Sequence, residues 1–429
     1  MEICLINPEA ARHQGEPQRL GEPLFPPLGL MTVGALTPEE HNVTLIDDSV
    51  EPVDLDMEPD LVALTALTAG APRAYDIADN FRHRGVPVVM GGMHVSALPE
   101  EALQHVDSVV VGEAERLWPR LLDDFEKNEM QPVYEHDEYP DPAEIPAARR
   151  DLIDADNYVA KYTMQASRGC PFACSFCSVT SFFGHTYRTR PLDDVVREMA
   201  EFEGEPVVLV DDNIMGHPSY AQKLFDRLAD VRKSFLSQAS ATMLKTPELI
   251  TQAAKAGCKG LFVGLESISP AQLAKMGKTH NIVEKYQELI DRLHDHGIAV
   301  VGSFMFGLDG DDRDVFSRTV EFAENAGIDV GQFSILTPFP GTELYRKLLE
   351  EERIIEDDWS RFNGSCATFI PRGEGLNRDT LEDGLKWIHQ RFYSWRSILK
   401  RTARRIQPVI WKINSIYHNH VAEWIGQEP

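Results

Sequence analysis

Three cysteines stand close together in one short run of the sequence. Cys170, Cys174 and Cys177 follow an apolar segment in the spacing C-x3-C-x2-C. Thiolates at this spacing can bind three irons of a cubane [4Fe-4S] cluster, which ordinarily has four cysteine ligands. The fourth iron is then open to a ligand that does not belong to the protein. The run therefore predicts an iron–sulfur centre with a free coordination position.

Zinc and disulfides are the other common uses of clustered cysteines. Tetrahedral structural zinc takes four ligands. Cys258 and Cys366 lie far along the chain, so a residue such as His185 would have to complete a zinc site. A disulfide framework is disfavoured, because six cysteines in 429 residues are sparse and the N-terminus does not resemble a secretory segment. The cluster is the favoured interpretation and zinc is the alternative.

The composition indicates a large acidic protein of two or three domains. The chain has 68 acidic and 42 basic residues, which gives a net charge of −26. Such a chain lacks the basic surface that phosphate binding needs, and this argues against nucleic acid as a partner. The sequence also contains no apolar run of about 18 residues that could span a membrane. We therefore expect a cytoplasmic protein, in which thiols stay reduced.

Residues 1–130 are expected to form a Rossmann-like, doubly wound parallel sheet. Short apolar strands alternate there with amphipathic helical segments. The predicted strands cover residues 2–6, 43–46, 61–65, 86–90 and 108–111. Ligands of such sheets bind at the carboxyl ends of the strands. The candidate binding residues at these ends are Thr65, Gly91, Gly92, His94, Gly112 and Glu113.

A second α/β domain is expected after a linker at residues 131–158, where prolines stand among acidic residues. Residues 159–369 repeat the strand–helix pattern six times, which predicts a partial (β/α)6 barrel. Barrel active sites lie at the carboxyl ends of the strands, and the first predicted strand, 162–167, leads into the cysteines. The polar or small residues expected around the cluster are Asp211, Asp212, Asn213, Glu266 and Gly307.

Residues 370–429 are expected to form a helical C-terminal tail. Its segment 392–412 is basic and aromatic in an otherwise acidic chain. One interpretation is a packing helix with a solvated charged face. The other is a peripheral contact with the inner face of the membrane, because basic and aromatic residues suit a bilayer interface. The residues that would make this contact are Arg401, Arg404, Arg405, Trp395, Ile398 and Trp411.

The cysteine spacing, with the aromatic Phe176 before the third cysteine, resembles the signature of the radical S-adenosylmethionine (SAM) superfamily. Residues 160–345 resemble the barrel of that superfamily. The runs at 91–94, 112–115 and 337–342 resemble its large subgroup with a preceding cobalamin (B12)-binding domain. The segment 387–398 resembles members that act on hopanoid lipids, which are C-methyltransferases.

This resemblance implies three cofactors: the [4Fe-4S] cluster, SAM and cobalamin. The open iron would bind the amino and carboxylate groups of SAM, and an electron from the cluster would cleave SAM to a 5′-deoxyadenosyl radical. Methylcobalamin would then supply a methyl group to an unactivated carbon of a small-molecule or lipid substrate. An external donor such as flavodoxin or ferredoxin would supply the electrons.

The residues named above receive roles from this resemblance. The three cysteines would hold the cluster. The residues expected to contact SAM are Phe176, Asp211, Asp212, Asn213, Glu266 and Gly307, and those expected to contact cobalamin are Thr65, Gly91, Gly92, His94, Gly112 and Glu113.

Three alternatives stay open at this point. The chain lacks the run Asp-x-His-x-x-Gly, whose histidine ligates cobalt in methionine-synthase-type domains. Cobalamin would therefore bind without that histidine, and the alternative is a first domain that is only structural. C-methylation is the favoured reaction, but a radical cyclase or an oxidative rearrangement enzyme would share the same architecture. A cluster- or cobalamin-based sensor is the alternative that is not an enzyme.

Overall fold

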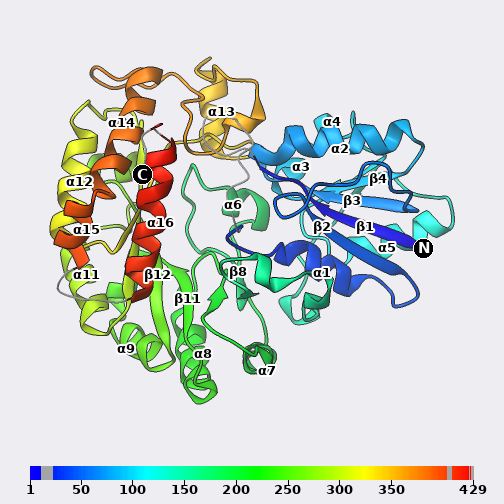
Figure 1. Ribbon diagram of the computed structural model, residues 1–429, viewed down its shortest axis with the longest axis horizontal. Coiled ribbons are helices and arrows are strands. Elements are labelled where there is room, and N and C mark those ends of the chain that lie inside the picture. Colours follow the sequence, from blue (N-terminus) through cyan, green and yellow to red (C-terminus); the bar gives the residue numbers. More distant parts are fainter. Residues whose placement is uncertain (11–22, 403–407, 425, 427–429) are drawn as a thin grey trace.

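The structure is a computed structural model that describes residues 1–10, 23–402, 408–424 and 426. The chain forms two lobes (Figure 1), a sheet domain built from the N-terminal part and a barrel domain with a helical tail. No helix in these described ranges is both long and apolar enough to cross a membrane.

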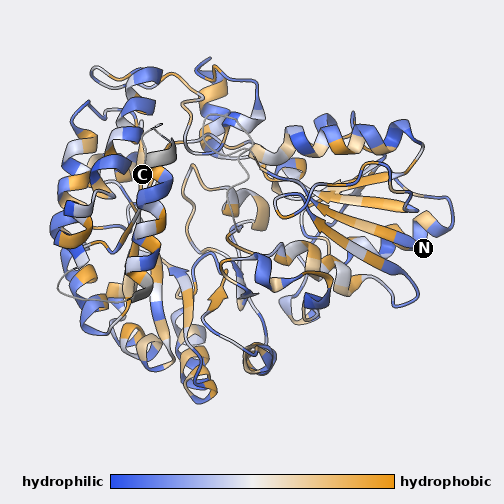
Figure 2. Cartoon of the chain, viewed as in Figure 1, coloured by the Kyte–Doolittle hydropathy of each residue, from blue (hydrophilic) through white to orange (hydrophobic). Residues whose placement is uncertain are grey.

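The first lobe is a six-stranded parallel sheet in the order β2-β1-β3-β4-β5-β6. Its central strands are buried on both faces, as a sheet covered by helices on both sides requires, and Figure 2 shows them as apolar. The strands are β1 (Glu2–Asn7), β2 (Asn42–Asp47), β3 (Leu61–Thr65), β4 (Val88–Gly91), β5 (Ser108–Val111) and β6 (Val133–Glu135). The helices are α1 (Leu28–Leu36), α2 (Ala71–His83), α3 (Met93–Ala97), α4 (Pro99–Ala102) and α5 (Leu117–Glu126).

The sixth strand lies in the segment for which the sequence predicted a linker. β6 pairs in parallel with β5, and short 3-10 helices follow it at 142–144, 150–152 and 155–157. Tyr134 explains the pairing, because its ring is buried in the core of the first lobe and its hydroxyl donates to Asp124. One buried aromatic side chain thus adds a strand that the acidic, proline-containing sequence around it does not suggest.

The second lobe is a six-stranded parallel sheet in the order β7-β10-β11-β12-β13-β14. The predicted fold class, a Rossmann-like sheet followed by a partial (β/α)6 barrel and a helical tail, is confirmed. The strands are β7 (Tyr162–Met164), β10 (Val207–Leu209), β11 (Phe235–Ala239), β12 (Cys258–Glu266), β13 (Ala299–Phe306) and β14 (Val330–Ile335). The helices are α7 (Leu192–Glu201), α8 (Pro218–Val231), α9 (Glu248–Lys255), α10 (Pro270–Lys275), α11 (Tyr286–Asp295), α12 (Val315–Ala326) and α13 (Glu343–Glu350).

The single strand predicted at 162–167 is divided in two. β7 belongs to the barrel sheet, whereas β8 (Ser167–Gly169) pairs antiparallel with β9 (Tyr187–Thr189). The cysteine loop and α6 (Ser178–Phe183) connect β8 to β9. The cysteines therefore follow a separate hairpin and not the first barrel strand itself. Figure 1 shows β8 and α6 between the two lobes.

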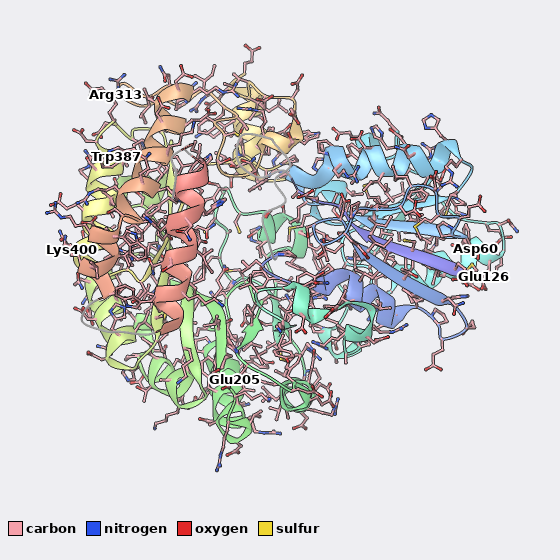
Figure 3. All side chains as sticks on the ribbon, in the orientation of Figure 1. Asp60, Glu126, Glu205, Arg313, Trp387 and Lys400 are labelled. Atoms are coloured by element: carbon pink, nitrogen blue, oxygen red, sulfur yellow. The ribbon has the colours of Figure 1, made fainter. Side chains whose placement is uncertain are left out.

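The tail consists of α14 (Arg378–Phe392), α15 (Trp395–Thr402) and α16 (Pro408–Trp424). These helices pack on β14 and α12, on the side of the barrel lobe that is remote from the first lobe (Figure 1). In Figure 3, Trp387 and Lys400 mark the outer edge of this layer.

Two residues that the sequence assigned to a membrane contact are buried instead. Arg401 is 3% exposed, donates to the backbone oxygens of Ile328 and Asp329, and lies 3.6 Å from the centre of the Phe392 ring. Burial lowers the pKa of this arginine to about 10. Ile398 is also fully buried. Arg401 and Ile398 therefore hold the tail to the barrel. Arg404 and Arg405 lie outside the described residues.

Candidate active site

Two aspartates after β10 hold the hairpin that leads to the cysteines. Asp211 is buried and accepts hydrogen bonds from the Ala166 N–H at 3.0 Å and from the Ser167 hydroxyl at 2.5 Å. Asp212 accepts one from the Gly169 N–H at 2.9 Å. Burial raises the pKa of Asp211 to about 6, against the hydrogen bonds, which lower it. Both carboxylates thus fix backbone immediately before the first cysteine.

Asn213 completes this support. Its amide nitrogen lies 3.9 Å from Sγ of Cys170 and 3.3 Å from Oγ of Ser240, and its oxygen accepts from the Ser240 N–H. The sequence predicted contacts with SAM for Asp211, Asp212 and Asn213. In the structure the observed partners of all three are residues of the protein around the cysteine hairpin, so they position the cluster ligands. A contact with SAM stays a prediction for Asp212 and Asn213, whereas the Asp211 carboxylate is enclosed by its partners.

The three cysteines lie together in the loop after β8, with free thiols that are partly exposed. Burial, together with the nearby Cys177 and Cys170, raises the pKa of Cys174 to about 11, against the positive charge of Lys278, which lowers it. Among the described residues, no group of three or more His, Cys, Asp and Glu side chains is arranged to hold a single metal ion. The donor set of three neighbouring, unpaired thiols fits the predicted three-cysteine cluster, whose binding would deprotonate them.

Lys278 brings a buried positive charge to this loop. Its ammonium forms an ion pair with Glu266 at 2.5 Å and lies 5.7 Å from the centre of the Phe176 ring. Burial alone would lower the pKa of Lys278, but Glu266 and the thiols of Cys174 and Cys177 raise it. The lysine thus stays protonated where thiolates would collect negative charge.

Glu266 ends β12 in an unusual backbone conformation. Its φ is +66°, and the pairing of β12 with β13 shifts register between Gly264 and Glu266. Non-glycine residues at positive φ are uncommon and cluster at functional sites. The carboxylate is directed at Lys278, so the predicted contact between Glu266 and SAM would involve a carboxylate that already has a cationic partner.

Phe176 and the ends of β13 and β14 enclose a small cavity of about 190 Å³. Leu308 and Leu336, which follow these two strands, line it together with Phe176. Gly307 lies at the same strand end, where its N–H donates to Asp311 at 3.1 Å. This apolar part of the wall suits the adenine ring of SAM, while charged residues such as Asp309 and Arg353 line the rest of the cavity. The assignment stays a prediction.

A larger cavity of about 420 Å³ lies between the two lobes. Its wall on the first lobe is formed by the carboxyl ends of β3, β4 and β5, and its wall on the second lobe includes Arg168 and Phe182. A cofactor bound here would lie between the sheet and the cysteine hairpin, which is the position that a shared reaction requires. The predicted cobalamin-binding residues that line it are Thr65, Gly91, Gly92, Gly112 and Glu113.

His94 is the candidate that the structure removes from this cavity. Its side chain is fully buried, and Nε2 lies 3.1 Å from the Tyr75 hydroxyl and 3.3 Å from Glu101. Trp359 of the second lobe packs against the imidazole and donates to the same Glu101 carboxylate at 2.8 Å. Burial lowers the pKa of His94. This histidine therefore belongs to a contact between the lobes and does not line the cavity, and its binding of cobalamin stays a prediction.

Gly92 has a structural reason of its own. Its φ is +102°, and a Cβ at this position would lie 2.8 Å from both the Ala66 carbonyl oxygen and Oγ1 of Thr65. Glycine is thus required by the neighbouring β3 loop. The close approach of cobalamin to Gly92, which we expected from the sequence, is an additional role that stays a prediction.

Glu113 and Glu115 dock the cysteine hairpin onto the first lobe. Glu113 forms buried ion pairs with Arg168 and Arg188, and Glu115 binds Arg168 at 2.6 Å. Arg168 lies on β8, two residues before Cys170. The run Gly112–Glu115 therefore connects the sheet domain directly to the strand that leads into the cluster ligands.

Sequence reasoning missed Lys278, Arg168 and Arg188. Arg168 stands inside the cysteine run itself, so its position was a signal for a role beside the cluster. Lys278 follows α10 in an ordinary polar turn, and only the fold brings it to the cysteine loop. Arg188 comes from β9, the hairpin strand that the sequence pattern did not predict.

Comparison with known families identifies both lobes. The family model of the Radical SAM superfamily matches residues 164–323, and that of the B12 binding domain matches residues 22–122. Bacteriochlorophyllide d C-8(2)-methyltransferase of Chlorobaculum tepidum is 32% identical over 425 residues, 94% of this chain and 93% of that protein. Hopanoid C-2 methylase of Rhodopseudomonas palustris is 27% identical over 351 residues, 78% of this chain and 66% of that protein.

The two-lobed fold also occurs in solved structures. OxsB, a cobalamin-dependent S-adenosylmethionine radical enzyme solved with aqua-cobalamin and S-adenosylmethionine bound, aligns with a TM-score of 0.69. The alignment covers 98% of this chain and 71% of OxsB at 16% identity. At this identity the likeness establishes the fold.

Proposed function

Because the chain belongs to the cobalamin-binding radical SAM family, we propose that it is a C-methyltransferase that acts on an unactivated carbon of a small molecule. The single observation that carries the proposal is the position of the cysteine hairpin. Arg168 lines the cavity between the lobes and lies on the strand that leads to Cys170. The cluster site and the cavity proposed for cobalamin are thus neighbours.

When bound, the cluster would supply the electron that cleaves SAM, and cobalamin would carry the methyl group that the substrate receives. The protein's own residues hold these groups in place. Cys170, Cys174 and Cys177 ligate the cluster, while Asp212 and Asn213 fix the loop that carries them. Burial between the lobes keeps water from the reacting carbon.

The cluster must be reduced before each cleavage of SAM, so the proposal includes an external one-electron donor such as flavodoxin or ferredoxin. The partial exposure of the three cysteines supports direct access by such a donor.

A peripheral membrane contact of the tail is part of the proposal in a changed form. Trp395 and Trp387 are 45% and 42% exposed on the tail helices, whereas Arg401 and Ile398 are buried. Exposed tryptophans suit a bilayer interface. The Trp395→Glu variant should therefore float less with anionic vesicles than wild type does. A variant that floats as well as wild type would contradict the contact.

The reaction is tested with SAM that carries a labelled methyl group. Candidate substrates are incubated anaerobically with the reconstituted enzyme, and products are analysed by mass spectrometry. Label in the product establishes methylation. A changed product without label would indicate the cyclase or rearrangement alternative, and a protein that never cleaves SAM would contradict both.

A further inference from the structure

A third cavity, of about 770 Å³, lies beside the space between the lobes. We call it the entrance cavity. Its walls come from the segments that follow β1 and β3, from α3 and α6, from the loop after β14, and from Phe362 and Asn363. Its volume is within the range of small-molecule sites. Its larger apolar wall residues are Leu67, Met93, Phe182, Phe339, Pro340 and Phe362.

The entrance cavity adjoins both proposed reaction centres. Leu67, Met93 and Phe182 also line the cavity assigned to cobalamin. Ser178 and Ser181 of its wall lie on α6, which begins directly after Cys177. A molecule in this cavity would therefore stand next to the cluster loop and the cobalamin cavity at once.

The entrance cavity differs from its neighbour in charge. None of the 15 described residues that line it is charged, although 26% of the chain is. The cobalamin cavity, in contrast, contains the ion-paired Glu113, Arg168 and Arg190. A carboxylate moved from water into uncharged walls loses hydration without gaining a cationic partner, and this is costly.

Three of the five polar residues that line the entrance cavity, Ser96, Ser181 and Asn363, have side-chain partners in the protein. The Ser96 hydroxyl donates to the Gly92 carbonyl and accepts from the Gly112 N–H. The Ser181 hydroxyl donates to the Ser178 carbonyl. These groups have little capacity left for a ligand, and Thr68 and Ser178 add only neutral hydroxyls, so the wall offers its ligand mainly apolar contact and shape.

We infer that the entrance cavity binds the substrate and selects an uncharged, largely hydrocarbon molecule, or the uncharged hydrocarbon part of a larger one. This inference rests on the proposed function, because it assigns the cavity to the methyl acceptor. Leu67, 62% exposed at the rim, and Phe182, between the two cavities, are the residues that set this preference.

Two probes of the same shape test the inference. 1-Pyrenemethanol is neutral and 1-pyrenecarboxylate is anionic, and both are offered to the reconstituted full-length enzyme. Unbound probe is measured by chromatography after ultrafiltration. Wild type should bind the alcohol about tenfold more tightly than the carboxylate, because only the alcohol avoids an unpaired charge.

Two variants and a control test whether the entrance cavity causes the preference for the neutral probe. Leu67→Glu adds a charge at the rim and should weaken alcohol binding roughly fivefold, whereas Ser181→Lys should strengthen carboxylate binding by a similar factor. Leu399→Glu is the matched control, since Leu399 is 50% exposed on α15. This variant should bind both probes as wild type does.

Equal or tighter binding of the carboxylate, no binding of either probe, or an unaffected Leu67→Glu variant would overturn the inference. Transfer of a labelled methyl group from SAM to cobalamin is measured on the same preparations. If that transfer persists while the probe preference fails, the substrate class is wrong and the proposed function stands. If the methyl transfer is absent while the preference for the neutral probe holds, only the proposed function is contradicted.

Discussion

The backbone N–H of Gly169 donates a hydrogen bond to Oδ2 of Asp212 at 2.9 Å. This bond joins the end of the barrel strand β10 to the residue immediately before Cys170. The adjacent Asp211 and Asn213 bind the same hairpin on either side of it. A tripeptide of the barrel thus determines where the first cluster ligand stands.

Removal of this acceptor should loosen the cluster without preventing its formation. Loss of a hydrogen bond to a charged group costs about 1.5–3 kcal/mol, so reconstituted Asp212→Ala should release iron to a chelator at least roughly tenfold faster than wild type. Asp212→Asn keeps an acceptor oxygen and should release iron nearly as slowly as wild type. Identical release from all three proteins would mean that the bond does not support the loop.

Asp211 should make stability depend on pH. Burial raises its folded-state pKa to about 6, above its value in the unfolded chain, so its contribution is greatest below the unfolded pKa and is lost as pH rises through 6. Lowering the pH from about 7.5 to about 5 should stabilise wild type by about 1 kcal/mol relative to Asp211→Asn. Denaturant unfolding of both proteins at the two pH values measures this difference, and a difference that is constant with pH would contradict the assignment.

The ion pairs of Glu113 should hold the lobes in register. Glu113→Ala removes the carboxylate that Arg168 and Arg188 share in a buried site. This loss should destabilise the protein by about 3–5 kcal/mol and should reduce cobalamin retention. The control is Glu144→Ala, because Glu144 pairs with Arg116 on the surface; its unfolding free energy should stay near that of wild type. Comparable losses in the two variants would show that the buried cluster has no special role.

Alanine substitutions at Gly92 and Gly85 distinguish the cost of backbone strain from that of a steric clash. Gly92→Ala combines a positive φ with a Cβ only 2.8 Å from the Ala66 oxygen, whereas Gly85→Ala has a positive φ and no atom within 4 Å. Strain alone costs about 1–2 kcal/mol, so Gly85→Ala should lose about that much and Gly92→Ala more. Thermal unfolding measures the stability loss of both variants. Equal losses would contradict a clash between the new Cβ and the loop after β3.

The sequence was sufficient where the signal is local. Alternating apolar strands and helices predicted both sheets, and the spacing of Cys170, Cys174 and Cys177 predicted the cluster loop. What it could not provide were partners distant in the chain. His94 follows a glycine loop as a ligand would, yet Tyr75 and Trp359 enclose it. Arg401 belongs to a basic run, yet the carbonyls of Ile328 and Asp329 satisfy it inside the protein.

The short strands β6 and β9 show the same limit of local pattern. Each has three residues, too few for a periodic signal. β6 is fixed by the burial of Tyr134, and β9 by its pairing with β8. Because β9 also carries Arg188 to Glu113, the contact between the lobes could not be predicted without it.

We propose that this chain passes the methyl group of SAM to cobalamin beside its iron–sulfur cluster. The most direct measurement needs no substrate: the anaerobically reconstituted protein is given hydroxocobalamin, a strong one-electron reductant and SAM with a deuterated methyl group, and the bound cobalamin is analysed by mass spectrometry. We predict cobalamin that carries the deuterated methyl group. Protein that binds no cobalamin, or that leaves it unmethylated while it cleaves SAM to 5′-deoxyadenosine, would contradict the account.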